Sequence, residues 1–142
     1  MKRASPYLNF PGTTEEAFAF YASVFGGDAP RFLRYRDMGQ DGPDGDLVAH
    51  VSLPLADGVM LMGSDVSTAS QKDHRVGTNV EIHLAAEDAD EARRLFAALA
   101  EGGTVSMPLE KVAWSELFGA CIDRFGVRWM VDYEGSVQFG MP

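Results

Sequence analysis

The chain has 142 residues, of which 46% are hydrophobic and 23% charged, with 12 basic and 21 acidic residues and a formal net charge of -9. This is an ordinary globular composition, and its acidic balance argues against nucleic acid or an anionic membrane as a partner, since both bind clustered Lys and Arg. The single cysteine, Cys121, rules out an intrachain disulfide and favours a cytoplasmic location. No apolar run approaches the roughly 20 residues of a membrane span.

The first half of the chain predicts a strand, a helix and three further strands. The helix is expected over Thr14–Phe25, with Thr13 or Thr14 as its cap, acidic residues in its first turn and Gly26-Gly27 at its end. The strands are expected over 7–10, 31–36, 47–55 and 59–62, with a turn at 56–58. The polar stretch 64–77 has no apolar periodicity and is predicted to be a linker or a lid over a site.

The second half repeats this order of elements. A strand over 79–85 precedes a helix over 88–100, which Gly102-Gly103 ends, and strands follow over 105–108, 114–122 and 127–133. The last two strands show the period of two that marks one buried face. They predict Trp129 and Cys121 in the core and a turn at 123–126, where Asp and Gly suit tight backbone geometry.

The two helices also match residue by residue. Glu16-Ala17 corresponds to Glu91-Ala92, the apolar stripes align, and both helices stop at a double glycine, with an offset of 75 to 76 positions. This agreement favours an internal duplication. The fold class predicted is α+β, with two βαβββ halves, about 4–64 and 78–134, forming a curved open barrel within one domain over 1–142.

Three stretches then carry a resemblance to a known family. They are YLNFPGTTEEAFAFYASVFGG, LAEGGTVSMPL and WSELFGACIDRFGVRWMVDYE. Together with the duplicated βαβββ order they resemble the vicinal oxygen chelate (VOC) superfamily of glyoxalases, dioxygenases and bleomycin-resistance proteins. More narrowly they look like its PhnB-like branch, often labelled 3-demethylubiquinone methyltransferase-like.

The resemblance implies metal-ligand positions on the first and fourth strands of each half. These positions fall near Pro6, Leu61 or Met62, Glu81 and Met130. Pro and Leu cannot bind a divalent ion and Met is a poor ligand for hard cations, so no cofactor is predicted there. A divalent metal at an unusual site is the alternative, because Glu81 and His83, two apart on a predicted strand, could join His50 in a set of two histidines and one carboxylate. An exposed polar strand face is the simpler interpretation of the Glu-x-His pair.

A ligand cavity is expected on the concave side of the sheets, lined from both halves. Its predicted members are His50, Met62, Glu81, Trp114, Phe118 and Met130. His50 and Glu81 would be the polar anchors. Among the aromatic residues Trp114 is the best pocket candidate, because it follows a loop and its indole N–H needs a partner. His74 is predicted to be solvated.

The function predicted is the binding of a small molecule by a VOC protein without the usual metal. The alternatives are a metal-dependent enzyme, lyase-like or dioxygenase-like, with an unusual site, and a resistance-type protein that sequesters a compound. The sequence does not decide whether a reaction is catalysed. A homodimer is expected, since an open sheet edge must be paired or covered and symmetric dimers are the commonest soluble oligomers.

Overall fold

A computed structural model describes residues 1–56 and 58–137. Asp57, in the predicted turn at 56–58, lies outside the described residues, as do residues 138–142. The chain divides into two compact units, Met1–Arg75 and Val76–Pro142. No helix among the described residues is long and apolar enough to cross a bilayer.

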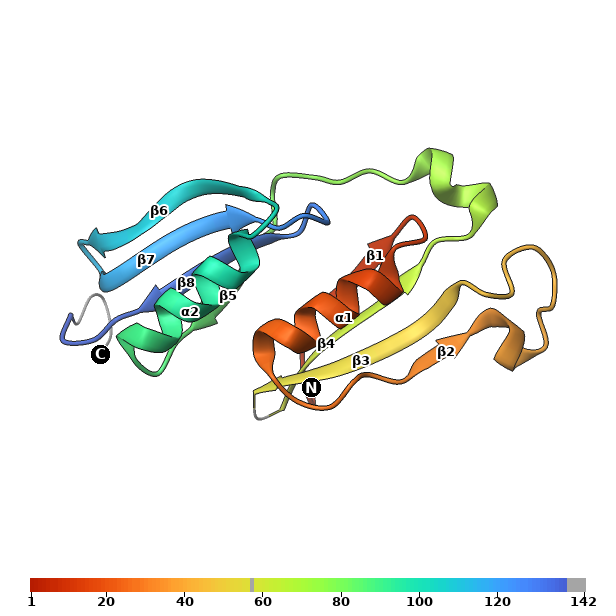
Figure 1. The fold of residues 1–142 in the computed structure, drawn as a ribbon, viewed down its shortest axis with the longest axis horizontal. Helices are drawn as coiled ribbons and strands as arrows, with labels where there is room; N and C mark the ends of the chain where they lie inside the picture. Colours follow the sequence, from red (N-terminus) through yellow and green to blue (C-terminus); the bar gives the residue numbers. More distant parts are fainter. Residues whose placement is uncertain (57, 138–142) are drawn as a thin grey trace. The chain divides into compact units, whose positions relative to one another are not determined.

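The first unit is a four-stranded sheet with one α-helix packed on one of its faces (Figure 1). Its elements are β1 (Tyr7–Phe10), α1 (Thr14–Phe25), β2 (Phe32–Arg34), the 3₁₀ helix η1 (Tyr35–Met38), β3 (Val48–Ala56), β4 (Val59–Asp65) and the 3₁₀ helix η2 (Thr68–Asp73). The strand order is β1-β4-β3-β2; β1 is parallel to β4 and the other pairs are antiparallel.

The second unit repeats this topology (Figure 1). Its elements are β5 (Ile82–Ala85), α2 (Ala89–Ala100), β6 (Thr104–Val112), β7 (Ser115–Ile122) and β8 (Arg128–Tyr133). The strand order is β5-β8-β7-β6, again with one parallel pair between the first and last strands. The predicted α+β class and duplicated βαβββ order are therefore confirmed, and so are both helices.

Each helix lies close to its sheet because a glycine leaves room for a phenylalanine ring. A Cβ on Gly63 of β4 would lie 2.7 Å from Cε2 of Phe18, and a Cβ on Gly119 of β7 would lie 2.9 Å from Cε2 of Phe96. Such contacts are shorter than packed cores tolerate. The face of each sheet that carries the glycine is therefore the face that the helix covers.

The start of α1 is held by a carboxylate from another strand, which corrects the prediction of a threonine cap. Thr13 makes no side-chain capping bond. Instead the buried Asp65 accepts hydrogen bonds from the backbone N of Thr14 at 3.0 Å, from its hydroxyl at 2.6 Å, and from the backbone N of Val48 at 2.9 Å. A distant acidic residue thus satisfies a donor that a helix N-terminus leaves unpaired.

Several predicted strands have different ends in the structure. The strand expected over 31–36 stops at Arg34, because the Asp37 carboxylate accepts a bond from the Arg34 amide and the chain turns into η1. The strand expected over 105–108 runs over Thr104–Val112, since it pairs with the whole of β7 through register shifts and tolerates Pro108 at a sheet edge. The stretch 64–77 is not irregular throughout: it contains the end of β4 and the helix η2.

The final hairpin is folded as its sequence predicts. Oδ1 of Asp123 accepts from the amides of Phe125 and Val127 at 2.8 and 3.0 Å, which fixes the turn. Its Oδ2 accepts from the indole Nε1 of Trp129 at 2.9 Å. Trp129 is fully buried and Cys121 nearly so, which confirms their predicted place in the core.

Candidate functional site

A chain of hydrogen-bonded polar side chains lies on the face of the first sheet opposite α1. Strand alternation places Tyr7, His50, Ser52 and Met62 on this helix-free face. Nδ1 of His50 is 3.2 Å from the Tyr7 hydroxyl, and its Nε2 is 3.0 Å from Oγ of Ser52. Both ring nitrogens of His50 are therefore engaged by hydroxyl groups, which can donate or accept as the imidazole requires.

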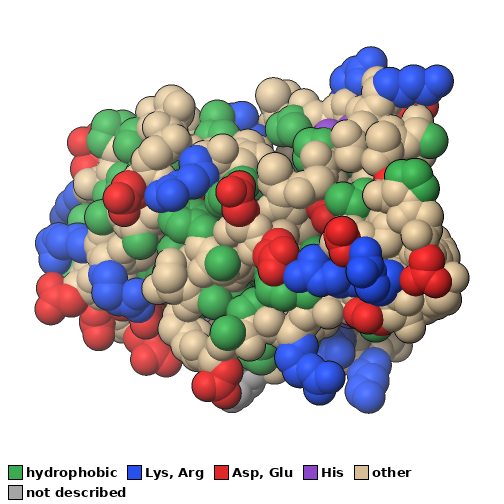
Figure 2. Space-filling view, turned by 45° about the vertical axis from the view of Figure 1, so that its right-hand side comes forward, with side chains coloured by type: hydrophobic (Ala, Val, Ile, Leu, Met, Phe, Trp, Pro, Cys, Tyr) green, Lys and Arg blue, Asp and Glu red, His purple; other side chains and the backbone are tan. Residues whose placement is uncertain are grey.

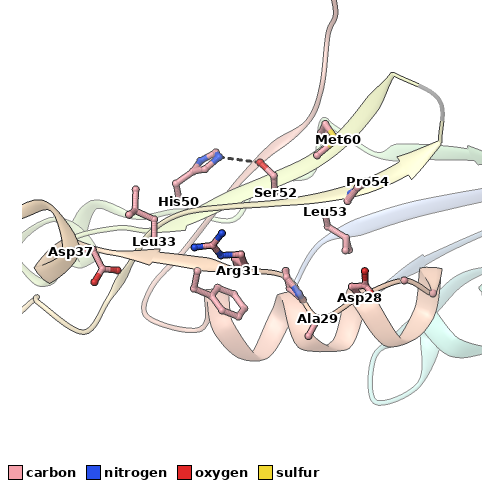
Figure 3. A pocket seen from close by; sticks show the side chains of 14 residues that line it. Asp28, Ala29, Arg31, Leu33, Asp37, His50, Ser52, Leu53, Pro54 and Met60 are labelled. Carbon is pink, nitrogen blue, oxygen red and sulfur yellow. Dashed lines mark hydrogen bonds between the residues drawn. The ribbon is translucent and has the colours of Figure 1, made fainter.

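A pocket of about 1020 Å³ opens beside these hydrogen-bonded side chains, and His50 and Ser52 line it. Its walls are mainly apolar or glycine: Gly26, Gly27, Ala29, Pro30, Phe32, Leu33, Leu53, Pro54 and Met60. Its polar groups are Asp28, Arg31, Asp37, His50 and Ser52. Figure 3 shows the His50 and Ser52 side chains on one side of β3, joined by their hydrogen bond, and Leu53 on the other side.

The pocket exists because β2 is short. β2 pairs with β3 only as far as Val51, so among residues 1–56 and 58–137 no strand pairs with β3 on that edge from Ser52 onward. The non-helical segment 26–31 runs from the end of α1 to β2 and supplies the opposite wall. A strand edge that is covered by a loop instead of a strand leaves space between them.

Of the predicted pocket residues, His50 is the one that lines this pocket. Met62 lies on the same helix-free face but does not line the pocket. The methionine that lines it is Met60, which is paired with Pro54 in the strand register. The sequence did not predict the pocket residues Arg31 and Ser52, nor Tyr7, whose hydroxyl group bonds to His50. The period of two starting from His50 gives a signal for Ser52, whereas the place of Arg31 depends on how the segment after α1 folds back.

The remaining predicted pocket residues belong to the second unit. Phe118 and Met130 lie on the helix-free face of that sheet, in register with Asp132 and Ala120 respectively. Trp114 stands in the β6–β7 turn with its ring edge-on to Phe118 at 5.3 Å, so Phe118 is buried while Trp114 stays 41% exposed.

Glu81 is not part of a strand, which corrects the predicted start at 79. β5 begins at Ile82, and Oε1 of Glu81 lies 3.8 Å from Nε of Arg128. His83, two residues on, is engaged by a different partner: its Nε2 is 2.9 Å from Oδ2 of Asp132. The two residues that the sequence places together as possible metal ligands thus face separate partners.

The residues at the implied metal positions do not form a suitable donor set. On the helix-free faces the register pairs Tyr7 with Met62 and His83 with Met130. Thioethers are poor ligands for hard cations, and no group of three or more His, Cys, Asp or Glu side chains in the described parts of the chain could hold a metal ion. The absence of a metal remains a prediction, which elemental analysis of the purified protein would test.

Cys121 is not a candidate nucleophile. Burial raises the pKa of its thiol to about 11, with the Asp123 carboxylate adding to the effect. The thiolate is the reactive form, and it is scarce at neutral pH.

On the surface, acidic and basic side chains are interspersed on the face that Figure 2 shows.

Comparisons with known proteins agree on one family. The model of the 3-demethylubiquinone-9 3-methyltransferase family matches residues 2–132. Protein PA1353 from Pseudomonas aeruginosa is 37% identical, with a TM-score of 0.81 over 93% of this chain and 97% of that chain. Protein YjdN from Escherichia coli is 29% identical over 90% of this chain and 92% of its own length.

A more distant likeness concerns the fold alone. A glyoxalase/bleomycin resistance protein/dioxygenase family enzyme from Burkholderia phytofirmans is 12% identical and has a TM-score of 0.61, over 92% of this chain and 96% of that chain. The two βαβββ units therefore have the glyoxalase, or VOC, fold.

Proposed function

From the premise that this chain belongs to the 3-demethylubiquinone-9 3-methyltransferase family, the PhnB-like branch of the VOC superfamily, we propose that it binds a small, mainly apolar organic molecule without a metal. The observation that supports the proposal most directly is the pocket beside β3. We do not propose the methyl transfer that appears in the family's name, because the pocket alone carries the inference.

The pocket has the size and chemistry of a ligand site. Its volume of about 1020 Å³ lies just above the usual range for small-molecule sites, about 300–1,000 Å³. Apolar walls with a few convergent polar groups are typical of such sites, because burial supplies affinity and the polar groups supply orientation. Here His50, held by Tyr7 and Ser52, is the ordered polar anchor.

Charge limits the ligand class. Arg31 forms no ion pair within residues 1–56 and 58–137, and Asp28 and Asp37 line the same pocket. A ligand with a strong charge of either sign would meet a like charge. An uncharged aromatic molecule with one hydrogen-bonding group suits the walls best.

The test uses phenylnaphthylamine, an uncharged aromatic fluorophore, and protein purified without an affinity tag. Leu33→Glu places a charge on the pocket wall and should raise the Kd for the probe about tenfold or more, equivalent to about 1.4 kcal/mol. Val80→Glu is the matched control, because Val80 is also an exposed apolar residue but lies outside the pocket. Equal effects of the two substitutions, or no saturable binding, would refute the proposal.

The metal-free part of the proposal has its own test. Elemental analysis of the same preparation should find less than stoichiometric transition metal, and native mass spectrometry would identify any retained organic molecule. A stoichiometric ion that His50→Ala or His83→Ala removes would favour the alternative, a metal-dependent enzyme.

We further propose a cytoplasmic homodimer. The outer edge of β6 has no strand partner among the described residues, and such an edge has to be covered or paired. Sedimentation at micromolar concentration should give about twice the 15.4 kDa mass of the chain. A single 15.4 kDa species would contradict it.

A further inference from the structure

A histidine on the helix-free face of the second sheet is held by a buried carboxylate. Nε2 of His83 lies 2.9 Å from Oδ2 of Asp132, and the His83 side chain is 49% exposed while that of Asp132 is 9% exposed. The other carboxylate oxygen of Asp132 accepts a hydrogen bond from the buried Ser115 hydroxyl. Neither His83 nor Asp132 lines the pocket of the first unit.

This arrangement orients the imidazole for proton transfer. An ionised carboxylate only accepts hydrogen bonds, so Nε2 of His83 carries the proton and Nδ1 keeps its lone pair. No described residue donates to Nδ1 of His83. A buried carboxylate fixes the tautomer of its histidine and stabilises the imidazolium that forms when the ring takes up a proton.

The surroundings of His83 favour an apolar aromatic ligand. Met130 stands next to His83 in the register, and Ala120 stands next to Met130 on the same face. Beyond them lies the aromatic pair of Phe118 and the half-exposed Trp114. The oriented imidazole thus lies beside the small Ala120 and flexible Met130 side chains, and the Trp114 indole lies at one end of this apolar row.

A cation lies on the same face. Arg128 is two residues from Met130 on β8, so about 6.6 Å separates the two along the strand. Its Nε is buried without a hydrogen-bond partner in the described part of the chain, and the Glu81 oxygen at 3.8 Å is too far for one. The Arg128 side chain as a whole is 22% exposed, and its positive charge can stabilise negative charge that develops on a nearby ligand.

We propose that this face is a proton-abstraction site in which His83 is the base, Asp132 its positioning residue, Arg128 the group that faces the developing anion, and Trp114 the ring against which an aromatic substrate stacks. In the step, Nδ1 of His83 forms a bond to the proton as a C–H or O–H bond of the substrate breaks. The electron pair stays on the substrate, and the imidazolium is stabilised by Asp132.

The test uses nitrobenzisoxazole, an aromatic probe for oriented bases. Its C–H proton goes to the base, the electron pair forms a nitrile as the ring N–O bond breaks, and the coloured phenolate is released. General-base catalysis contributes about a hundredfold or more, so His83→Ala should lower kcat/KM by about that factor. His74→Ala, which alters a histidine at the end of η2, should leave the rate unchanged.

Two further variants separate positioning from structure. Asp132→Asn should lower kcat at least tenfold with little change in KM, because the amide can hold the wrong tautomer. Trp114→Ala should raise KM and leave kcat nearly unchanged. If the wild-type rate does not exceed that of an equal concentration of free imidazole, or if His83→Ala keeps the wild-type rate while its circular dichroism is native, the proposal is wrong.

Discussion

The two units share a topology but use a buried aspartate at the end of their last strand in opposite ways. Asp65 faces α1 and accepts bonds from Thr14 and Val48, so it ties a helix and two strands together. Asp132 faces away from α2 and binds the Ser115 hydroxyl and the His83 ring. Because side chains alternate along a strand, a one-residue shift turns a structural carboxylate into one that supports a site.

The edges of the two sheets differ as well. β6 has nine residues and pairs along the whole of β7, whereas β2 has three residues, so that within the described residues the second half of β3 pairs with β4 but has no strand on its β2 side. The first unit therefore has a pocket at its edge. In the second unit the polar groups lie on the helix-free face of the sheet. Duplication preserved the scaffold, while strand length and register determined where each unit presents its chemistry.

The largest expected effect tests which face of the last hairpin is core. Trp129→Ala should lower the free energy of unfolding by about 3–5 kcal/mol, the usual cost of truncating a large buried aromatic residue, and it also removes the bond to Asp123. Trp114→Ala should cost less than about 1 kcal/mol, since Trp114 is 41% exposed. Urea unfolding of both variants gives the comparison. A larger loss for Trp114→Ala would reverse the two faces.

The next effect compares the two aspartates. Asp65→Ala leaves two amides and one hydroxyl without their acceptor and should cost about 3 kcal/mol, at about 1 kcal/mol or more for each buried donor. Asp132→Ala should cost about 1 kcal/mol, because the half-exposed His83 can bond to water instead and only the buried Ser115 hydroxyl loses its acceptor. Chemical denaturation measures the free energy of unfolding of both variants. Equal losses would mean that Asp132 is as structural as Asp65.

The effect that is smallest at neutral pH concerns the ionisation of the Cys121 thiol. Burial raises the pKa of Cys121 to about 11 in the folded chain, whereas an exposed thiol ionises near 8.5. Between these values the unfolded chain has released the proton that the folded chain keeps, so stability should fall as pH rises from about 8.5 to about 11. Unfolding midpoints of Cys121→Ala should show a shallower decline over that window. An unchanged slope would mean that the thiol is not protected.

Local patterns predicted the parts of the fold that local interactions determine. Both helices follow from apolar stripes, acidic first turns and double-glycine ends, and the final hairpin follows from alternation around Asp123. The end of β2 depends on the bond from the Arg34 amide to Asp37, and the extent of β6 depends on register shifts in its pairing with β7. The apolar pattern encodes neither feature, so the sequence misplaced both strand ends.

The candidate sites were harder to predict for the same reason. His50 was predicted from its place in an apolar strand and from the family resemblance, but the pocket beside it depends on the length of β2. The His83–Asp132 pair depends on the register between β5 and β8, which no local pattern encodes. Strand alternation does place Asp132 on the same face as Met130, and that signal alone could have marked it.

The most direct test of the central claim, that the short β2 opens a small-molecule pocket, is amide chemical-shift mapping during titration with phenylnaphthylamine. The account predicts saturable shifts concentrated in residues 26–33, 50 and 52–54, which line the pocket, and their loss in Leu33→Glu but not in Val80→Glu. Saturable shifts that leave these two segments unchanged would contradict it.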